Sequence, residues 1–319
     1  MPLKKNIDYK NFLEIQVFNE FKSTDVVDTD SAVARFFDSI SHFDDDEFCE
    51  VLIFSGYIPD LYEPDGSPET LYSKFCEILV SSWATRIGLS ALPVKTKGSY
   101  EDVTIKIRGK TVVCDVKSFR LGRSQAAPNV KDFLKLEDIR KWLGRYSDKL
   151  GGLVVYPDKH EWKSGSDAYR YCSDKTVPTV MLSYKYLAAI LHFKNRFSVF
   201  DLERLWDFDR LFPAPLTDKS ENKSFYWRVI NKEIISILDI SFDEFQSYIS
   251  YADMKMANYL QSLLVHYNSL KNTIKSAIER EIDSYSLETM KKQLISMKVE
   301  SETKKYDVIL ERIKKFRLC

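Results

Sequence analysis

Alternating apolar and polar residues mark the middle of this chain. Val103, Ile105 and Ile107 are separated by polar residues, and beyond Gly109-Lys110 the run from Thr111 to Lys117 is mostly apolar and β-branched. A period of two residues is typical of a strand with one buried face, and a glycine between two such runs favours a tight turn. The pattern therefore predicts a β-hairpin.

Helical periodicity and further apolar runs surround this hairpin. Helices are expected at residues 31–40, 45–54, 69–87, 134–149, 184–193 and 199–207, and almost throughout from Tyr226 to the C-terminus. Two more strands are expected at residues 151–156 and 179–182, the second beginning after Pro178. This order predicts an α/β (α+β) fold, a mixed β-sheet flanked by helices.

The same pattern divides the chain into three regions. Turn formers are concentrated between Pro59 and Pro68, after the first helical stretch. We therefore expect a helical N-terminal region at residues 1–67, a core at residues 68–215 and a helical C-terminal region at residues 216–319. The last region is expected to serve in packing, dimerisation or DNA contacts.

Composition and charge narrow the class of protein. The 319 residues are 44% hydrophobic, which is ample for a buried core, and the formal net charge is zero. Residues 1–70 nevertheless hold 16 acidic and 5 basic residues, whereas residues 104–149 hold 12 basic and 5 acidic residues. Zero net charge argues against a uniformly basic DNA-coating protein, but positive charge is concentrated around the hairpin.

The spacing of the cysteines and histidines, and the lack of long apolar runs, argue against several other classes of protein. The five cysteines form no CxxC pair, and the four histidines are not in HxH or HxxxH spacing, so neither disulfides nor a zinc site is predicted. No Gly-rich phosphate loop, signal peptide or membrane span is apparent in the sequence. A cytoplasmic protein without a membrane partner is expected.

Charged residues at the ends of the hairpin form the candidate catalytic site. With the turn at Gly109-Lys110, Arg108 would pair with Thr111 and Asp102 with Lys117, which places Asp102, Asp115 and Lys117 on one face. Two neighbouring carboxylates repel each other unless a cation joins them, and Mg²⁺ takes one or two carboxylates alongside phosphate oxygens. The cluster predicts metal-assisted phosphodiester hydrolysis, with Lys117 positioning water or stabilising charge. The alternative is a salt bridge on a solvated hairpin.

Glu77 is a further candidate metal ligand. It lies in the helix before the hairpin, whose apolar stripe would place it against the sheet. The alternative for Glu77 is a solvated helix residue.

A basic and polar segment follows Lys117 directly. Arginine binds phosphate and guanine edges through two hydrogen bonds, and short polar side chains reach base edges. The candidate DNA-binding residues are Ser118, Arg120, Arg123, Ser124, Gln125, Asn129 and Lys131. The alternative is the basic exterior of an ordinary helix.

Several blocks in the same order resemble a known family. Asp115-Val116-Lys117-Ser118-Phe119-Arg120-Leu121-Gly122-Arg123, followed by Lys131-Asp132-Phe133, is similar to the active-site segment of the HindIII-type type II restriction endonucleases, which are PD-(D/E)xK nucleases. The resemblance covers residues 68–210. Glu101 stands where the motif name has proline, and Ala126-Ala127-Pro128 alters the DNA-reading loop, so the recognition sequence is not transferred.

The resemblance implies a restriction enzyme and its partners. It implies a homodimer that uses Mg²⁺ to cut a short palindromic site in double-stranded DNA, beside a methyltransferase that protects host DNA. Asp102, Asp115 and Lys117 match the family's catalytic positions, and Glu77 matches an acidic position in the preceding helix.

Two alternatives remain open from the sequence. A nuclease of the same fold used in repair or junction resolution would select DNA structure rather than DNA sequence. A non-catalytic DNA-binding protein would carry the acidic cluster for structural reasons.

Overall fold

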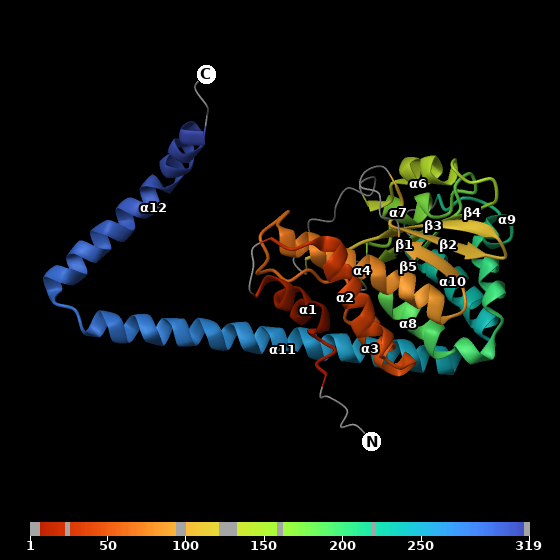
Figure 1. Cartoon of the computed structure of the whole chain (residues 1–319), viewed down its shortest axis with the longest axis horizontal. Helices are drawn as coiled ribbons and strands as arrows, with labels where there is room; N and C mark the ends of the chain where they lie inside the picture. The colour runs from red at the N-terminus through yellow and green to blue at the C-terminus, as the bar shows by residue number, and fades with distance from the viewer. Residues whose placement is uncertain are drawn as a thin grey trace. The chain divides into compact units, whose positions relative to one another are not determined.

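A computed structural model describes residues 7–22, 26–93, 100–120, 133–157, 162–217 and 221–315, with side chains up to residue 304. The chain divides into two compact units, residues 1–256 and residues 257–319. The first unit contains a five-stranded sheet with the order β1-β2-β3-β4-β5 (Figure 1). Its strands are β1 (Ser90–Pro93), β2 (Val103–Ile107), β3 (Lys110–Val116), β4 (Lys149–Tyr156) and β5 (Thr179–Ser183).

The sheet is mixed, as the sequence predicts. β1, β2 and β3 are joined by antiparallel pairing, whereas β3, β4 and β5 are parallel. Parallel strands are covered on both faces, and β5 is accordingly buried along its whole length. The predicted fold class is confirmed.

The β2–β3 hairpin turns one residue earlier than predicted. Ile107 pairs with Lys110, so the turn residues are Arg108 and Gly109, with φ of 49° and 82°. Two-residue hairpin loops favour positive φ at both central positions, and the chain satisfies this with a left-handed arginine before the glycine. The predicted pairing of Arg108 with Thr111 and of Asp102 with Lys117 is therefore wrong. The register differs by two residues, which leaves each side chain of the paired strands on its predicted face.

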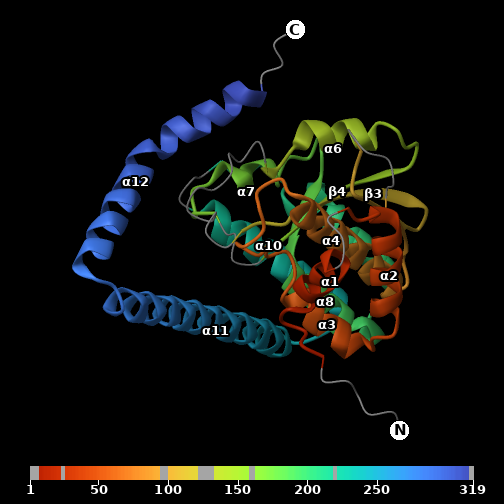
Figure 2. The same ribbon diagram turned by 60° about the vertical axis from the view of Figure 1, so that its left-hand side comes forward.

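Helices cover both faces of the sheet. α4 (Ser67–Arg86) packs on β1, β2 and β3, and α6 (Leu136–Leu143) packs on β3 and β4 from the opposite side (Figure 2). The Gly151-Gly152 pair of β4 lets neighbouring side chains approach both faces of the strand closely. A Cβ on Gly152 would lie 2.7 Å from Ile139 of α6, and one on Gly151 would lie 2.3 Å from Trp206. Trp206 ends the 3-10 helix η3 (Val199–Trp206).

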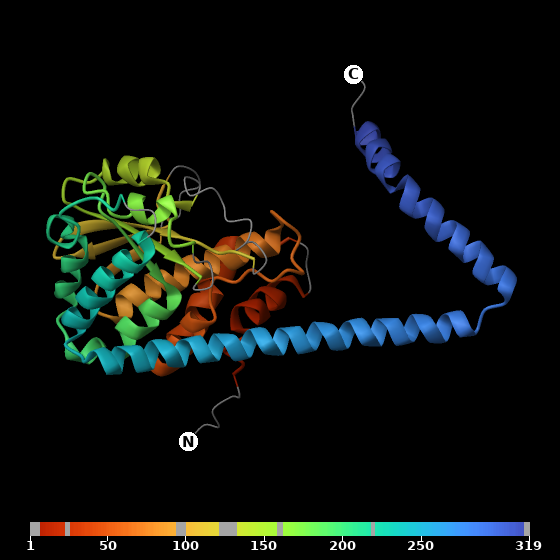
Figure 3. The same cartoon turned by 180° about the vertical axis from the view of Figure 1, so that it is seen from behind.

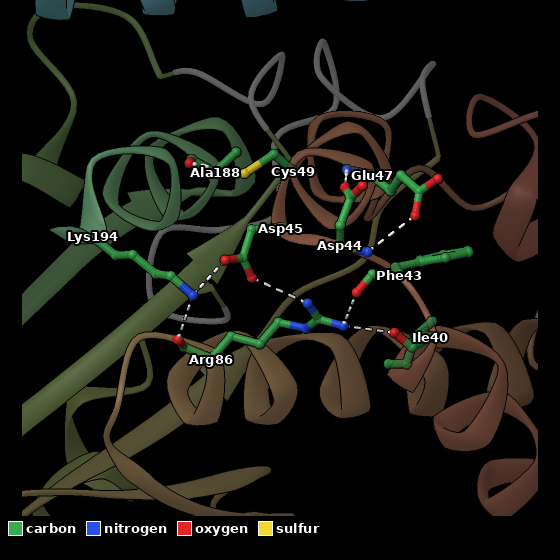
Figure 4. Close-up of polar contacts among 9 residues, drawn as sticks. All are labelled: Ile40, Phe43, Asp44, Asp45, Glu47, Cys49, Arg86, Ala188 and Lys194. Carbon is green, nitrogen blue, oxygen red and sulfur yellow. Dashed lines mark hydrogen bonds and ion pairs between the residues drawn. The ribbon is translucent and has the colours of Figure 1, made fainter. Parts of the chain in front are cut away.

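The N-terminal helices are α1 (Phe12–Phe21), α2 (Thr29–Ser41) and α3 (Asp45–Ile53). Asp44 caps α3 through a capping box with Glu47. Figure 4 shows how Arg86, at the end of α4, joins α2 to α3. Its guanidinium donates to the carbonyl of Ile40 at 2.8 Å and pairs with Asp45 at 3.2 Å. These contacts fix the orientation of α4.

Other elements complete the first unit around the sheet. α8 (Tyr184–His192) follows β5, as the sequence predicts, and it packs against α3. The short helices are α7 (Asp167–Tyr171), η2 (Lys194–Arg196) and α9 (Phe208–Leu211). The predicted helix at residues 134–149 is too long, because α6 ends at Leu143 and the chain from Lys149 pairs with β3. The predicted helix at residues 199–207 is of the 3-10 type.

The C-terminal part is helical, as predicted. α10 (Asn222–Leu238), α11 (Phe242–Asp283) and α12 (Leu287–Lys315) follow one another, and α11 is one continuous helix (Figure 3). Tyr226 and Ile230 of α10 are fully buried, and α10 contacts α7 and η3. The boundary between the two units falls within α11. In the described residues, no helix combines the length and apolar character that crossing a membrane requires.

Candidate active site

Asp115 and Lys117 form the centre of the candidate site at the end of β3. Asp115 is 4% exposed, and Lys117 Nζ lies 2.7 Å from Asp115 Oδ2. The two side chains share one side of the strand because they are two residues apart, as predicted. The pair is a partly buried ion pair, unlike the exposed salt bridge considered as an alternative.

Asp102 reaches across from the start of β2. Its backbone N–H donates to the carbonyl of Cys114 at 3.0 Å, and its Oδ2 accepts a hydrogen bond from the N–H of Val116 at 2.8 Å. Cys114 also pairs with Val103, so two residues of the β2 side lie opposite one residue of β3. The carboxylate of Asp102 is thereby held at the residue between Asp115 and Lys117.

Glu77 joins this group from α4. It is 8% exposed, and both of its carboxylate oxygens accept hydrogen bonds from Lys74 Nζ, at 2.8 and 2.7 Å. Its charge also interacts with those of Asp102 and Asp115. Glu77 is therefore no solvated helix residue, and its charge lies within electrostatic reach of Asp102 and Asp115. We call Glu77, Asp102 and Asp115, with Lys74 and Lys117, the carboxylate cluster.

Lys74 is the member of the carboxylate cluster that the sequence analysis missed. It lies three residues before Glu77, on the same face of α4. That spacing was visible in the sequence, but similar pairs are common on exposed helices. Only the burial of Glu77 gives this pair its significance.

Burial and mutual repulsion raise two carboxylate pKa values in the cluster. Burial and then the charge of Asp102 raise the pKa of Glu77 to about 8, although Lys74 opposes the shift. Burial and then the charge of Asp115 raise the pKa of Asp102 to about 6, opposed by the Val116 hydrogen bond and by Lys117. Both groups therefore resist carrying a full negative charge without an additional cation.

The cluster suits a hard divalent cation in its donor chemistry. Its acidic groups offer carboxylate oxygens, and Asp115 Oδ2 is buried without a hydrogen bond to any described residue, although Lys117 lies close. Within the described parts of the chain, no three His, Cys, Asp or Glu side chains converge as a metal cage would. Mg²⁺ needs only one or two carboxylates, since water and substrate phosphate supply the rest. Asp102 and Asp115 fit that smaller requirement.

The candidate DNA-binding residues fall into two groups. Arg123, Ser124, Gln125, Asn129 and Lys131 lie outside the described residues. Ser118 and Arg120 are described, and both are turned toward the protein. The Ser118 hydroxyl is buried beside the thiol of Cys76, while Arg120 pairs with Glu69 at 2.6 Å and donates to the carbonyl of Pro59 at 3.2 Å. A direct DNA contact from either residue stays a prediction.

Two buried thiols near the carboxylate cluster are held in their neutral form. Burial raises the pKa of Cys76 to about 11 and raises that of Cys114, which lies beside Asp115, well above its usual range. Both thiols are therefore protonated at neutral pH and pack as small apolar groups.

A family model described as HindIII restriction endonuclease matches residues 16–304. The chain belongs to this family. The Type II restriction enzyme HindIII of Haemophilus influenzae is 26% identical over 200 residues, which are 62% of this chain and 64% of that enzyme. The match thus spans just under two thirds of that relative's length.

Membership of the HindIII restriction endonuclease family confirms the resemblance drawn from the sequence. The family consists of DNA-cleaving hydrolases, and type II restriction endonucleases generally use a divalent metal ion. The family match extends over the carboxylate cluster, the helices on both faces of the sheet and most of the C-terminal helices.

Proposed function

We propose that this chain is a type II site-specific deoxyribonuclease that cuts a short palindromic site in double-stranded DNA with Mg²⁺. One observation carries the proposal. The hydrogen bond from Val116 N–H to Asp102 Oδ2 holds one acidic group directly beside the Asp115–Lys117 pair. Family membership makes DNA the substrate that this cluster is expected to hydrolyse.

Four members of the carboxylate cluster have a role in this proposal. When bound, Mg²⁺ supplies Lewis-acid polarisation of the scissile phosphate. Asp102 and Asp115 would hold the ion, and Glu77 would contribute a further carboxylate from α4. Lys117 Nζ would orient the attacking water or stabilise the negative charge that develops on the phosphate.

Substrate binding and assembly follow from the same proposal. The segment from Ser118 to Lys131 would contact DNA, and a homodimer would present two active sites, one for each strand of a palindrome. A methyltransferase of the same restriction-modification system would protect the host DNA without binding this protein. The family match supports these proposals, while the DNA sequence recognised has to be measured.

Digestion of a long plasmid in Mg²⁺ tests the proposal and separates its rivals. A restriction enzyme gives discrete bands whose lengths add up to that of the plasmid, and sequencing the fragment ends identifies the site. Cuts only at branched or damaged positions would instead indicate a repair or junction nuclease. Binding without any cleavage would indicate a non-catalytic DNA-binding protein.

A further inference from the structure

A further buried carboxylate lies directly beside the candidate site. Glu101 is 2% exposed and immediately precedes Asp102. Its Oε1 accepts hydrogen bonds from the hydroxyl of Thr104, at 3.0 Å, and from that of Tyr146. Tyr146 lies in the segment between α6 and β4, so Glu101 ties the start of β2 to the layer that contains α6.

Arg145 strengthens the same tie. Its Nη1 lies 3.7 Å from Glu101 Oε2, and its guanidinium stacks 3.7 Å from the centre of the Tyr100 ring. Oε2 itself is buried and accepts no hydrogen bond from the described residues. A buried carboxylate satisfied at one oxygen only is costly, and a neutral side chain could tether β2 at a lower cost. The nearby Arg145 guanidinium offsets part of this cost, and the contacts with Thr104 and Tyr146 need an oxygen acceptor rather than a full charge.

Successive side chains of an extended segment point in opposite directions. The contacts of Glu101 with Thr104 and Tyr146 direct its side chain toward the segment after α6. The following carboxylate, that of Asp102, points instead to Val116 of β3. Asp102 lies outside the regular pairing of β2 with β3, because its N–H bonds to Cys114, which already pairs with Val103. The direction of the Asp102 side chain therefore depends on the contacts that hold Glu101.

We propose that Glu101 is a positioning residue that holds the carboxylate of Asp102 toward the Asp115–Lys117 pair. The effect of Glu101 on cleavage rests on the proposed function, whereas its effect on the position of Asp102 does not. Glu101 touches neither substrate nor metal in this scheme. It acts through Asp102, and Tyr146 is its partner across the gap between β2 and α6.

The direct test measures amide hydrogen exchange at Val116, whose N–H is bound by Asp102. Glu101→Ala should accelerate exchange at Val116 about 10-fold or more, while leaving that of Val180 in β5 unchanged. Glu101→Gln keeps an oxygen acceptor for Thr104 and Tyr146 and should remain near the wild type. Tyr146→Phe should give an intermediate rate. Equal acceleration at Val116 and Val180, or none at Val116, would overturn the proposal.

Divalent-ion binding and kinetics test the consequence for the site. Supporting residues around metal sites typically change affinity or activity by about 10- to 100-fold. Glu101→Ala should weaken Ca²⁺ binding measured by calorimetry and lower kcat by that factor, with KM for DNA unchanged. The matched control is Glu233→Ala, because Glu233 is also a buried acid, held by Arg204 and Arg210 far along the chain. The control should lose stability but keep both ion affinity and kcat.

The two proposals fail in distinguishable ways. A wild-type protein that cuts no DNA would end the proposed function, yet the exchange rates at Val116 would still decide the role of Glu101. An active wild type whose Glu101→Ala variant keeps its kcat, its Ca²⁺ affinity and its Val116 exchange rate would reduce Glu101 to a structural residue.

Discussion

At the scale of single residues, the carboxylate cluster is an unbalanced set of charges. Glu77, Asp102 and Asp115 share their surroundings with the ammonium groups of Lys74 and Lys117. Each lysine is bound closely to one acid, so Asp102 relies mainly on a backbone hydrogen bond. A divalent cation would convert the repulsion between Asp102 and Asp115 into two attractive contacts.

Asp115 is the residue on which cleavage should depend most directly. Asp115→Ala removes the buried Oδ2 and the partner of Lys117, and we expect DNA cleavage to fall below detection in Mg²⁺. DNA binding in Ca²⁺ should remain within a few-fold of the wild type, because the substitution removes a negative charge. A gel-shift titration in Ca²⁺ and a cleavage assay in Mg²⁺ give the two readouts. The exposed Asp148→Ala variant serves as control, and cleavage retained by Asp115→Ala would remove this residue from the mechanism.

Glu77 should make the stability of the metal-free protein depend on pH. Its pKa is raised from 4.5 to about 8, so the folded state binds the proton more tightly than the unfolded state does. The free energy of unfolding must therefore fall as pH rises from about 4.5 toward 8. Glu77→Gln stays neutral and removes this fall.

Calorimetry in EDTA should show that Glu77→Gln melts at a higher temperature than the wild type at pH 8 and at nearly the same temperature at pH 5. Each kcal/mol corresponds to roughly 2–4 °C for a domain of this size. The sign is the critical result. A lower melting temperature for Glu77→Gln at pH 8 would mean that the ion pair with Lys74 outweighs burial and repulsion.

At the scale of elements, hydrophobic periodicity was sufficient to predict most of the sheet and part of the site. The alternation in β2 and the apolar run of β3 predict the hairpin, and therefore the proximity of Asp102 to Asp115. The register was not predictable, because it depends on Arg108 taking a left-handed conformation. β1 was missed because it is short, half-exposed and ends at Pro93.

Two substitutions in the observed turn should change the free energy of unfolding in opposite directions. Arg108 and Gly109 both have positive φ, which asparagine tolerates better than arginine and which alanine does not favour. Arg108→Asn should raise the free energy of unfolding by about 0.5 kcal/mol, and Gly109→Ala should lower it by about 1–2 kcal/mol. Urea unfolding measures both. A turn at Gly109-Lys110 would give no gain from Arg108→Asn, since Arg108 would then be an ordinary strand residue.

At the scale of the whole molecule, the proposed homodimer needs an interface, and the second unit carries a candidate surface. Apolar residues recur every three or four positions along the part of α11 that belongs to residues 257–283, and they are strongly exposed. Among these positions, Leu264 is 60% exposed, Ile274 is 59% exposed and Ile278 is 49% exposed. Such spacing forms one stripe on a helix, and helices with such stripes pair with other helices.

Negative charge introduced into this stripe should separate a dimer that is built on it. If a second copy of the chain covers it, replacing Leu270 and Ile274 with glutamate should place like charges in the interface and convert the dimer into monomers. The matched control replaces Asn272 and Ser276, which lie on the opposite face of the same helix turns, with the same residue and should remain dimeric. Light scattering after gel filtration measures the mass directly. A wild type with the mass of a single chain would end the homodimer proposal, whereas a stripe variant that keeps the doubled mass would place the interface elsewhere.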